Sequence, residues 1–163
     1  MPHLDAAYNL ARWLTRNEHD AQDVVQDAFL RAFKFFGGFH GGNSRSWLLS
    51  IVRNTTYTWL QKNRKHELAT VFDEEVHDIE DTSSSLEALL LKNSDRQEIV
   101  QALEQLPVEF REVMVLRELE GMSYREIAEM AEVPIGTVMS RLARARKQLQ
   151  QSLGQRLQPG VSK

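Results

Sequence analysis

This sequence of 163 residues has no cysteine, few prolines and glycines, and no long hydrophobic run. Without cysteine, disulfide bonds, thiolate metal sites and cysteine nucleophiles are excluded, which fits a reducing compartment. No apolar stretch approaches membrane-spanning length and no signal peptide is visible. We therefore expect a cytoplasmic protein without membrane insertion. Alternating β-branched residues are also rare, whereas helical periodicity runs through most of the chain, so the expected fold class is all-α.

The net charge is only −3, but the charges are segregated along the chain. Residues 66–95 hold nine acidic residues against the single basic residue Lys92, with a run of serines in the middle. This composition predicts an acidic flexible linker, in which Leu86 to Leu91 could form a short helix. We therefore expect two small helical domains, at residues 1–65 and 96–153, followed by a C-terminal tail at 154–163.

The last third of the chain has the pattern of a helix-turn-helix. Ser123 and Glu126 form an S-x-x-E capping box, which predicts a helix starting at Tyr124. Pro134 suits the first turn of a second helix, where its missing N–H costs nothing. The apolar residues of that second helix recur at spacings of three and four, and they are Ile135, Val138, Leu142, Ala145 and Leu149.

The opposite face of this second helix is basic and small. Arg pairs bidentately with guanine, Thr and Ser reach phosphates or base edges, and Gly136 and Ala143 permit close approach. The candidate DNA-binding residues are Arg125, Thr137, Ser140, Arg141, Arg144 and Lys147. An ordinary helical hairpin with a solvated basic face is the alternative. The Ser-Tyr-x-Glu-Ile-Ala start followed by Pro-x-Gly-Thr-Val favours the DNA-binding motif.

Two further helices precede this motif in the second domain. The first is expected over Gln97–Leu106, with Ile99, Val100, Leu103 and Leu106 on its apolar side. The next should start at Pro107 and end at Gly121, and should bury Phe110, Val113, Met114 and either Leu116 or Leu119. Together the four helices make a helix-turn-helix domain.

The N-terminal domain should contain helices at Leu4–Leu14 and Asp20–Phe36, the second stopped by Gly37 and Gly38. The second helix combines an apolar stripe of Val25, Ala28, Phe29, Ala32 and Phe36 with a face on which an exposed leucine lies among aspartates. Such a face suits docking of a basic, partly apolar partner, although a merely solvated charged face is the alternative. The candidate docking residues are Asp20, Asp23, Gln26, Asp27, Leu30 and Arg31.

A third helix is expected from Ser44, as N-cap, to about Arg64. Its inner face should hold Leu48, Ile51, Val52, Thr55 and Trp59. Its other side combines cations, amides and aromatic rings, which single-stranded DNA-binding proteins use to hold phosphates and to stack bases. These candidates are Trp47, Arg53, Asn54, Tyr57, Gln61 and Arg64, preceded by the loop Phe39–Asn43. The aromatic residues could instead be core, which is favoured for Trp59 and open for Trp47 and Tyr57.

Catalysis and cofactors find no support in the sequence. The five histidines show no metal-ligand spacing, and His77 among carboxylates is the nearest approach to a metal site. No phosphate-binding glycine loop, nucleophile motif or inward carboxylate pair is present. We expect no enzyme activity, no cofactor, no metal and no small-molecule substrate.

Taken together, these motifs resemble the bacterial sigma factors of the extracytoplasmic-function group. Asp20-Ala-Gln-Asp-Val-Val-Gln-Asp-Ala-Phe-Leu-Arg-Ala-Phe33 resembles the family's helix for the RNA polymerase β′ clamp helices. Arg45-Ser-Trp-Leu-Leu-Ser-Ile-Val-Arg-Asn54 resembles its element for melting and reading the downstream promoter box. Leu106-Pro-x-Glu-Phe-Arg-Glu-Val, with the helix-turn-helix, resembles its domain for the upstream box. The resemblance covers essentially the whole chain in the family's order.

The resemblance implies an alternative sigma factor with RNA polymerase core (β′ clamp helices and β flap), promoter DNA and an anti-sigma factor as partners. A stand-alone repressor or activator is the rival, but no dimerisation helix or ligand pocket is evident. The chain departs from the family pattern at Glu132, where glycine is usual, and at Met139, where lysine is common. Because a left-handed residue other than glycine costs about 1–2 kcal/mol, Glu132 predicts a differently shaped turn.

Overall fold

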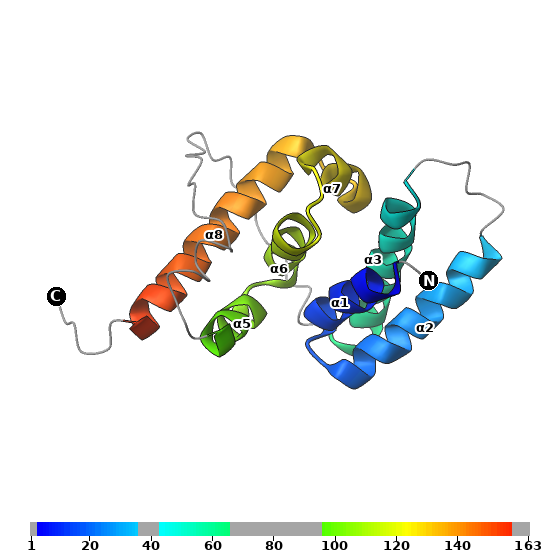
Figure 1. The fold of residues 1–163 in the computed structure, drawn as a ribbon, viewed down its shortest axis with the longest axis horizontal. Coiled ribbons are helices and arrows are strands. Elements are labelled where there is room, and N and C mark those ends of the chain that lie inside the picture. The colour runs from blue at the N-terminus through cyan, green and yellow to red at the C-terminus, as the bar shows by residue number, and fades with distance from the viewer. Residues whose placement is uncertain (1–2, 36–42, 66–95, 158–163) are drawn as a thin grey trace.

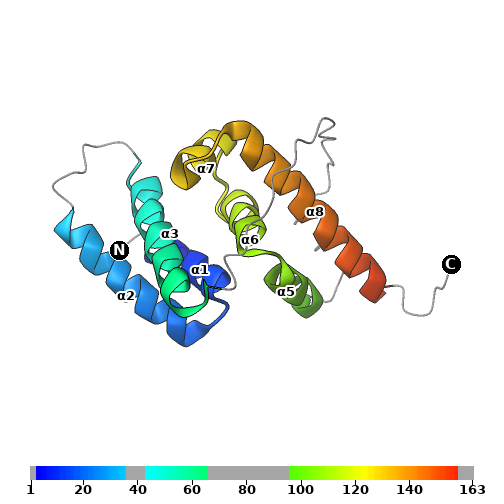
Figure 2. The same ribbon diagram turned by 180° about the vertical axis from the view of Figure 1, so that it is seen from behind.

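The computed structural model describes residues 3–35, 43–65 and 96–157, and the side chains among these up to residue 154. Every secondary-structure element in these ranges is helical, so the expected all-α class is confirmed (Figures 1 and 2). The elements are α1 (Leu4–Thr15), α2 (Glu18–Lys34), α3 (Ser44–Asn63), α5 (Arg96–Gln105), α6 (Val108–Met114), η3 (Val115–Leu119), α7 (Tyr124–Ala131) and α8 (Ile135–Leu157). The predicted linker, the stop at Gly37 and Gly38, and most of the loop Phe39–Asn43 lie outside the described residues.

The first three helices pack on one another as a bundle, and asparagines begin two of them. Asn17 caps α2 by accepting a hydrogen bond from the Asp20 amide at 2.9 Å, so the helix begins two residues before the predicted Asp20. Asn43 caps α3 by accepting from the amides of Arg45 and Ser46. The prediction of Ser44 as N-cap was therefore wrong by one residue, because the asparagine amide oxygen takes the two free amides.

Helix α3 is packed on two sides, which the sequence pattern did not indicate. Leu49, Thr56 and Leu60 are fully buried in addition to the predicted inner residues, whereas Ile51 and Trp59 are only half-buried. The helix contacts α1 and α2 on one side and α7 on the other. A helix with two buried sides has little amphipathic contrast, so periodicity alone divides its faces poorly.

In the C-terminal half, α6 runs directly into the π-helical turn η3, and Gly121 ends the segment in a left-handed conformation with φ 66°. Of the two leucines that the sequence left as alternatives for the core, Leu116 is buried and Leu119 is exposed. Val100 of α5 and Ile135 of α8 are also exposed, contrary to their predicted apolar stripes. Helix α8 continues to Leu157, beyond the predicted domain boundary at residue 153.

The helix-turn-helix forms as the sequence predicts. The Ser123 hydroxyl accepts from the Glu126 amide at 3.1 Å, and the Glu126 carboxylate accepts from the Ser123 amide at 3.0 Å. Glu132 ends α7 with φ 58° and ψ 47°. The prediction of a differently shaped turn was wrong, because Glu132 adopts the left-handed conformation that a glycine would take.

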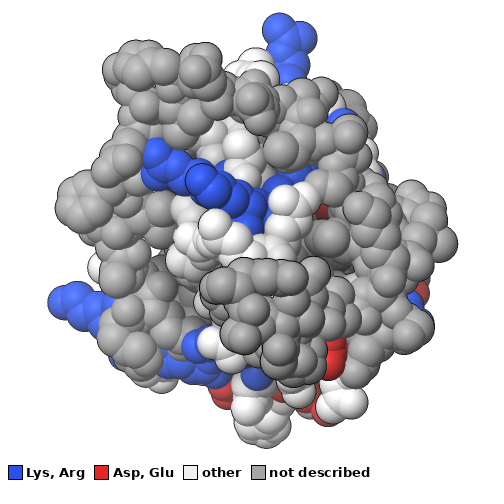
Figure 3. Space-filling model, turned by 90° about the vertical axis from the view of Figure 1, so that its left-hand side faces the viewer, with Lys and Arg blue, Asp and Glu red and all other residues white. Residues whose placement is uncertain are grey.

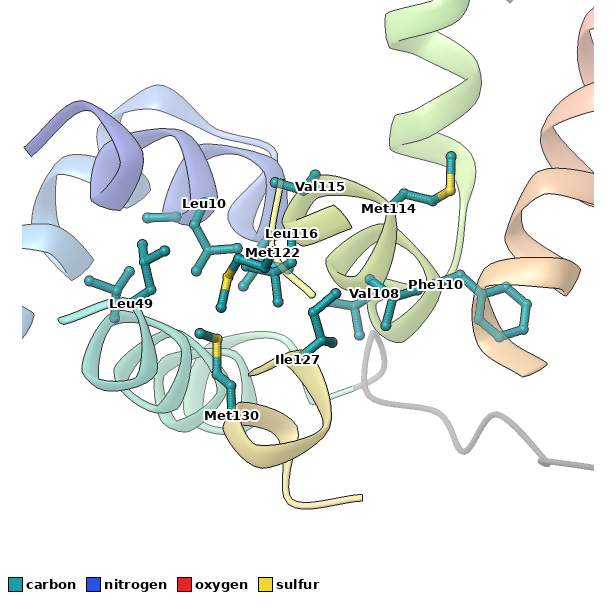
Figure 4. Packing of buried hydrophobic residues seen from close by; sticks show 14 of the residues in the cluster. Leu10, Leu49, Val108, Phe110, Met114, Val115, Leu116, Met122, Ile127 and Met130 are labelled. Carbon is teal, nitrogen blue, oxygen red and sulfur yellow. The ribbon is translucent and has the colours of Figure 1, made fainter. Parts of the chain in front are cut away.

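The two halves of the molecule pack directly against each other. Helix α1 lies on α6 and η3, and α3 lies on α7. Figure 4 shows Leu10 of α1 and Leu49 of α3 turned toward Leu116 and Met122 of the C-terminal half, and all four belong to one continuous hydrophobic cluster. The two predicted helical units are thus present, but they share a core across their boundary.

One buried cation reinforces this boundary. Arg111 of α6 is almost fully buried and donates to the carbonyl oxygens of Trp13 and Leu14 at 2.6 and 3.1 Å. It also donates to the carbonyls of Leu106 and Glu104. Both carbonyl pairs lie at helix C-terminal ends, where a positive charge is favourable. Arg111 therefore fastens the end of α1 to the end of α5.

Candidate nucleic-acid interface

The face of α8 predicted to meet duplex DNA is partly open. Lys147 and Arg125 are exposed, and Thr137 and Arg144 are half-buried. Figure 3 shows Lys and Arg side chains on the side of the molecule toward which α8 ends, with Asp and Glu atoms toward the bottom of the view. Within the described residues, this half carries no acidic side chain after Glu132, so the charged side chains of α8 are all basic.

Two of the predicted contacts face inward. Ser140 and Arg141 are only 9% and 8% exposed, and an Arg141 guanidinium nitrogen lies 3.3 Å from a carboxylate oxygen of Glu109. Their placement on an open DNA-facing surface was wrong. For Arg141 the reason is the packing of α6 against α8, which places Glu109 of α6 beside its guanidinium group.

The candidate residues for the downstream box lie on the side of α3 that meets the C-terminal half. Arg53 donates through Nε to the buried Glu112 carboxylate at 2.6 Å, and its guanidinium lies 4.3 Å from the centre of the Tyr57 ring. Burial acts to lower the pKa of Arg53, but Glu112 and Tyr57 together raise it. Burial, and secondarily the Glu112 charge, raises the pKa of the Tyr57 phenol well above its usual range. These groups form a charged cluster inside the molecule.

The remaining candidates on α3 divide between buried and exposed positions. Trp47 is half-buried against the core, whereas Asn54 and Gln61 are exposed. Arg64 pairs with Asp20 and donates to the carbonyl of Thr15, and its guanidinium lies 5.0 Å from the centre of the Trp59 ring. The helix therefore does not present its cations and rings as one open stacking surface in this conformation.

The N-terminal turn of α3 makes contacts that the sequence analysis missed. Arg45 pairs with the Glu120 carboxylate at 3.0 Å and also donates to the carbonyl of Glu120. The Asn43 amide and the Ser46 hydroxyl both donate to the Glu126 carboxylate at 3.1 Å. No local signal could have found these pairs, because each joins residues more than seventy positions apart.

The docking candidates on α2 lie mostly on an open face. Asp23, Gln26, Asp27 and Arg31 are exposed, and Leu30 is 67% exposed. Asp20 is the exception, because it pairs with Arg64 at the base of the bundle. Asp23 lies 3.7 Å from His19, and Asp27 lies 3.5 Å from Arg31 along the same helix.

This face of α2 also carries an aromatic residue that was not among the predicted docking residues. Phe33 is 77% exposed and lies three residues after Leu30 and seven after Gln26, which places it on the same stripe of α2. The spacing that revealed Leu30 could have revealed Phe33 as well. Phe35, one position past the helix, is 58% exposed. The exposed face of α2 is therefore apolar at its C-terminal end and acidic before it.

Other kinds of site are limited in the described part of the chain. A groove of about 630 Å³ lies between α1 and α2, lined by Tyr8 and Val25 and by acidic and amide side chains. Among the described residues, no three His, Asp or Glu side chains gather closely enough to hold a metal ion. None of the described helices is both long and apolar enough to cross a membrane.

Comparison with known families matches both halves of the chain. The family described as Sigma-70 region 2 matches residues 1–66, and the family described as Sigma-70, region 4 matches residues 96–149. The region 2 match corresponds to the bundle of α1 to α3, and the region 4 match corresponds to the half that contains the helix-turn-helix.

Similar proteins are found over most of the chain. The RNA polymerase sigma-H factor of Pseudomonas aeruginosa is 34% identical over 86% of this chain and 78% of that protein. The ECF RNA polymerase sigma-E factor of Escherichia coli K12 is 36% identical over 78% of this chain and 71% of that protein. The ECF RNA polymerase sigma factor SigE of Mycolicibacterium smegmatis is 32% identical over 93% of this chain, which spans only 58% of that relative's length.

A solved structure also matches. It is the co-crystal structure of the sigma factor RpoE with the anti-sigma factor NepR from Bartonella quintana, with a TM-score of 0.70 and 32% identity. The match covers 93% of this chain and 91% of that one, so both halves are superposed together.

Proposed function

Because the chain belongs to the family of extracytoplasmic-function RNA polymerase sigma factors, we propose that it binds the polymerase core and directs transcription from promoters of a particular sequence. The observation that carries this proposal is the order of its parts. A region-2 bundle with an acidic and apolar face on α2 precedes a region-4 helix-turn-helix with a basic face on α8. The proposed role is recognition rather than catalysis, and its partner would place it in the bacterial cytoplasm.

In the proposed division of roles, α8 binds the upstream box as duplex. Lys147, Arg144, Arg125 and Thr137 lie on the accessible side of the motif and supply cations and a hydroxyl for phosphates and base edges. Phosphate contacts fix the helix in the major groove, and base contacts choose the sequence. Ser140 and Arg141 join them only if the edge of α8 against α6 becomes accessible.

The α3 face would read the downstream box as single strand. Arg53, Asn54, Tyr57 and Trp47 supply the cation, amide and rings that hold an unpaired strand, and Gln61 and Arg64 extend the face toward the end of the helix. Opening about ten base-pair steps costs on the order of 14 kcal/mol at roughly 1.4 per step. That cost exceeds what two small domains supply, so the core polymerase provides the channel and the chain provides the choice of sequence.

The α2 face would bind the polymerase β′ clamp helices through Asp23, Gln26, Asp27 and Leu30, and the helix-turn-helix half would meet the β flap. An anti-sigma factor is the further expected partner, and the match to a sigma factor crystallised with one supports it. A stand-alone repressor is not favoured, because the relatives are sigma factors over most of the chain.

The experiment is transcription in vitro from fragmented bacterial genomic DNA, with core polymerase alone and with the chain added. We expect new transcripts whose start sites share two upstream boxes of fixed spacing. Absence of promoter-specific RNA at saturating chain would overturn the proposal. Tight operator binding by the chain without polymerase would instead support the repressor.

A substitution at Lys147 tests the proposed contact of α8 with the upstream box. Replacement of Lys147 by Ala should weaken holoenzyme binding to promoter duplex and reduce the slope of log K against log salt by about one, since one phosphate contact is lost. Gln148→Ala, at the next position, which is also exposed, is the matched control and should leave the slope unchanged. An unchanged slope for Lys147→Ala would remove this residue from the interface.

A further inference from the structure

Three apolar side chains follow one another at spacings of four along the first turns of α8. Ile135 is 44% exposed, and Met139 and Ala143 are half-buried. Residues four apart in a helix are neighbours on its surface, so these three form one continuous row. We name Ile135, Met139 and Ala143 the apolar row. The next position at the same spacing is the exposed Lys147.

The centre of the apolar row lies outside the core. The core side of α8 is formed by residues such as Val138 and Leu142, which are almost fully buried. Because successive helical positions turn by about 100°, Met139 is turned by that angle from Val138. Gly136, one turn before Met139, is exposed, and no described atom outside the local helix lies within 4 Å of the place that its β-carbon would take. The side of Met139 that adjoins Gly136 is therefore open.

The apolar row occupies the part of α8 that meets base edges in a helix-turn-helix. In this motif the N-terminal residues of the second helix contact the bases, whereas other positions contact the DNA backbone. Figure 1 shows the first turns of α8 beside α7. Ile135 and the exposed Arg125 of α7 line one groove of about 480 Å³. Cations for phosphates, Arg125 and Lys147, therefore stand at both ends of the apolar row.

The chemistry of the major groove leaves one partner for such a row. Among the base edges exposed there, the C5 methyl group of thymine is the apolar group, and the others are hydrogen-bond donors and acceptors. An apolar side chain placed against a G·C edge removes water from polar atoms without replacing their hydrogen bonds, which costs free energy. Against a thymine methyl group it buries apolar surface of both partners. An unbranched methionine can adapt to a methyl group on either strand.

We infer that the apolar row, centred on Met139, contacts thymine methyl groups in the upstream box and so selects A·T pairs at those positions. This inference rests on the proposed function, because it takes α8 as the helix that binds the upstream box as duplex. In this assignment the cations hold α8 on the phosphates of any sequence. Met139 is a specificity-determining residue, since its contact depends on which base pair lies beneath it.

The test uses holoenzyme made from the full chain and core polymerase, on a promoter found by the transcription experiment above. Each thymine of the upstream box is replaced in turn by deoxyuridine, which removes the methyl group and keeps the hydrogen-bonding edge. We expect replacement at the thymine under Met139 to weaken equilibrium binding about fourfold, which is the effect of losing the burial of roughly one methyl group. The ratio of the two affinities at that thymine is the quantity compared between variants.

Variants of Met139 connect this ratio to one side chain. Met139→Gln keeps the length and the helix propensity of the residue but makes its end polar, so the ratio should fall to about one. Met139→Leu keeps an apolar side chain and should retain most of the ratio. Because both promoters are measured with the same protein, a general loss of stability lowers both affinities and leaves the ratio unchanged. The comparison is a double-mutant cycle between Met139 and the methyl group.

Leu119→Ala is the matched control, because Leu119 lies outside α8 and is as exposed as Ile135, at 45%. It should keep the ratio, and so should Lys147→Ala, which weakens binding to both promoters. A ratio of one at every thymine in the parent, an upstream box without A·T pairs, or an unchanged ratio in Met139→Gln would overturn the inference and leave promoter-specific transcription intact. Absence of promoter-specific RNA would instead overturn the proposed function, and this inference with it.

Discussion

At Glu132 the backbone between α7 and α8 is left-handed, and its amide closes the end of α7 by donating to the carbonyl of Ala128. A β-carbon in this conformation costs about 1–2 kcal/mol, which glycine would not incur. The turn keeps its shape because the flanking helices, with Ala128 and Val138 buried between them, determine the path of the chain. The packing of the two helices thus stabilises the strained conformation of this one residue.

Replacement of Glu132 by Gly should therefore stabilise the protein by about 1 kcal/mol, since strain relief exceeds the added entropy of the unfolded chain of about 0.4–1 kcal/mol. Urea unfolding followed by circular dichroism measures the change. Glu129→Gly, within the same helix but in right-handed backbone, should instead destabilise by about 1 kcal/mol. A destabilised Glu132→Gly would show that the carboxylate makes a contact worth more than the strain.

The contribution of Glu126 to stability depends on pH. Its hydrogen bond from the Ser123 amide, with further bonds from Ser123, Ser46 and Asn43, lowers the pKa of this carboxyl below its ordinary value of 4.5. The ionised form therefore contributes stability that is fully present above about pH 4.5 and is lost as the pH falls through the lowered pKa.

The variant Glu126→Gln should accordingly be less stable than the parent at pH 7, with the difference shrinking as the pH falls below 4.5. Glutamine retains the capping box, so the pH-dependent part reports the charge alone. Thermal unfolding of both proteins from pH 7 to pH 3 measures it. A difference that stays constant over this range would exclude ionised Glu126 as a source of stability.

At the scale of an element, α2 separates stability from binding. Its buried side, with Val24 and Ala28, holds the bundle together, while Phe33 and Leu30 on the other side are exposed and support nothing in the described fold. A large apolar side chain retained at such exposure is typical of a binding surface. The helix therefore serves the core with one face and the proposed polymerase contact with the other.

Replacement of Phe33 by Ala should change the free energy of unfolding by less than about 0.5 kcal/mol, but should weaken association with core polymerase about tenfold or more, as for an aromatic anchor. Asp27→Ala should also weaken core association and leave DNA binding by the helix-turn-helix half unchanged. Phe35→Ala, an exposed aromatic off the stripe, is the matched control. Quantitative pull-down with core polymerase measures the association of all three variants. Equal weakening of association by Phe33→Ala and Phe35→Ala would show that the contact is not specific to the stripe of α2 that carries Leu30 and Phe33.

At the scale of the whole molecule, the two halves share one hydrophobic cluster and a buried arginine that bonds to both. Removing the C-terminal half would expose Leu10 and Leu49, and removing the N-terminal half would expose Met122 and Met130. Cooperative unfolding follows when one core spans both parts.

The full chain should therefore unfold in a single calorimetric transition, with calorimetric and van't Hoff enthalpies that agree. The triple variant Glu112→Gln, Glu120→Gln, Glu126→Gln should broaden or split that transition, because it weakens the contact between halves. Differential scanning calorimetry measures this. Two resolved transitions in the parent chain would mean that the halves are energetically independent.

Much of the fold was predictable from local pattern. The positions of α1, α7 and α8, the capping box of Ser123 and Glu126, and the family itself all follow from spacings within a few residues. The errors were of another kind. Asp20, Ser140 and Arg141 fall on the expected helical faces, yet another helix or a basic partner covers each of them.

The sequence alone determined which segments are helical, where two of their ends lie and which family the chain belongs to, because periodicity and capping act between neighbours in the chain. Only the tertiary structure decided which charged side chains remain available. Arg53 meets Glu112 across 59 positions of sequence, and Arg45 meets Glu120 across 75. Such pairs depend on how two helical bundles pack together, and no local pattern specifies that packing.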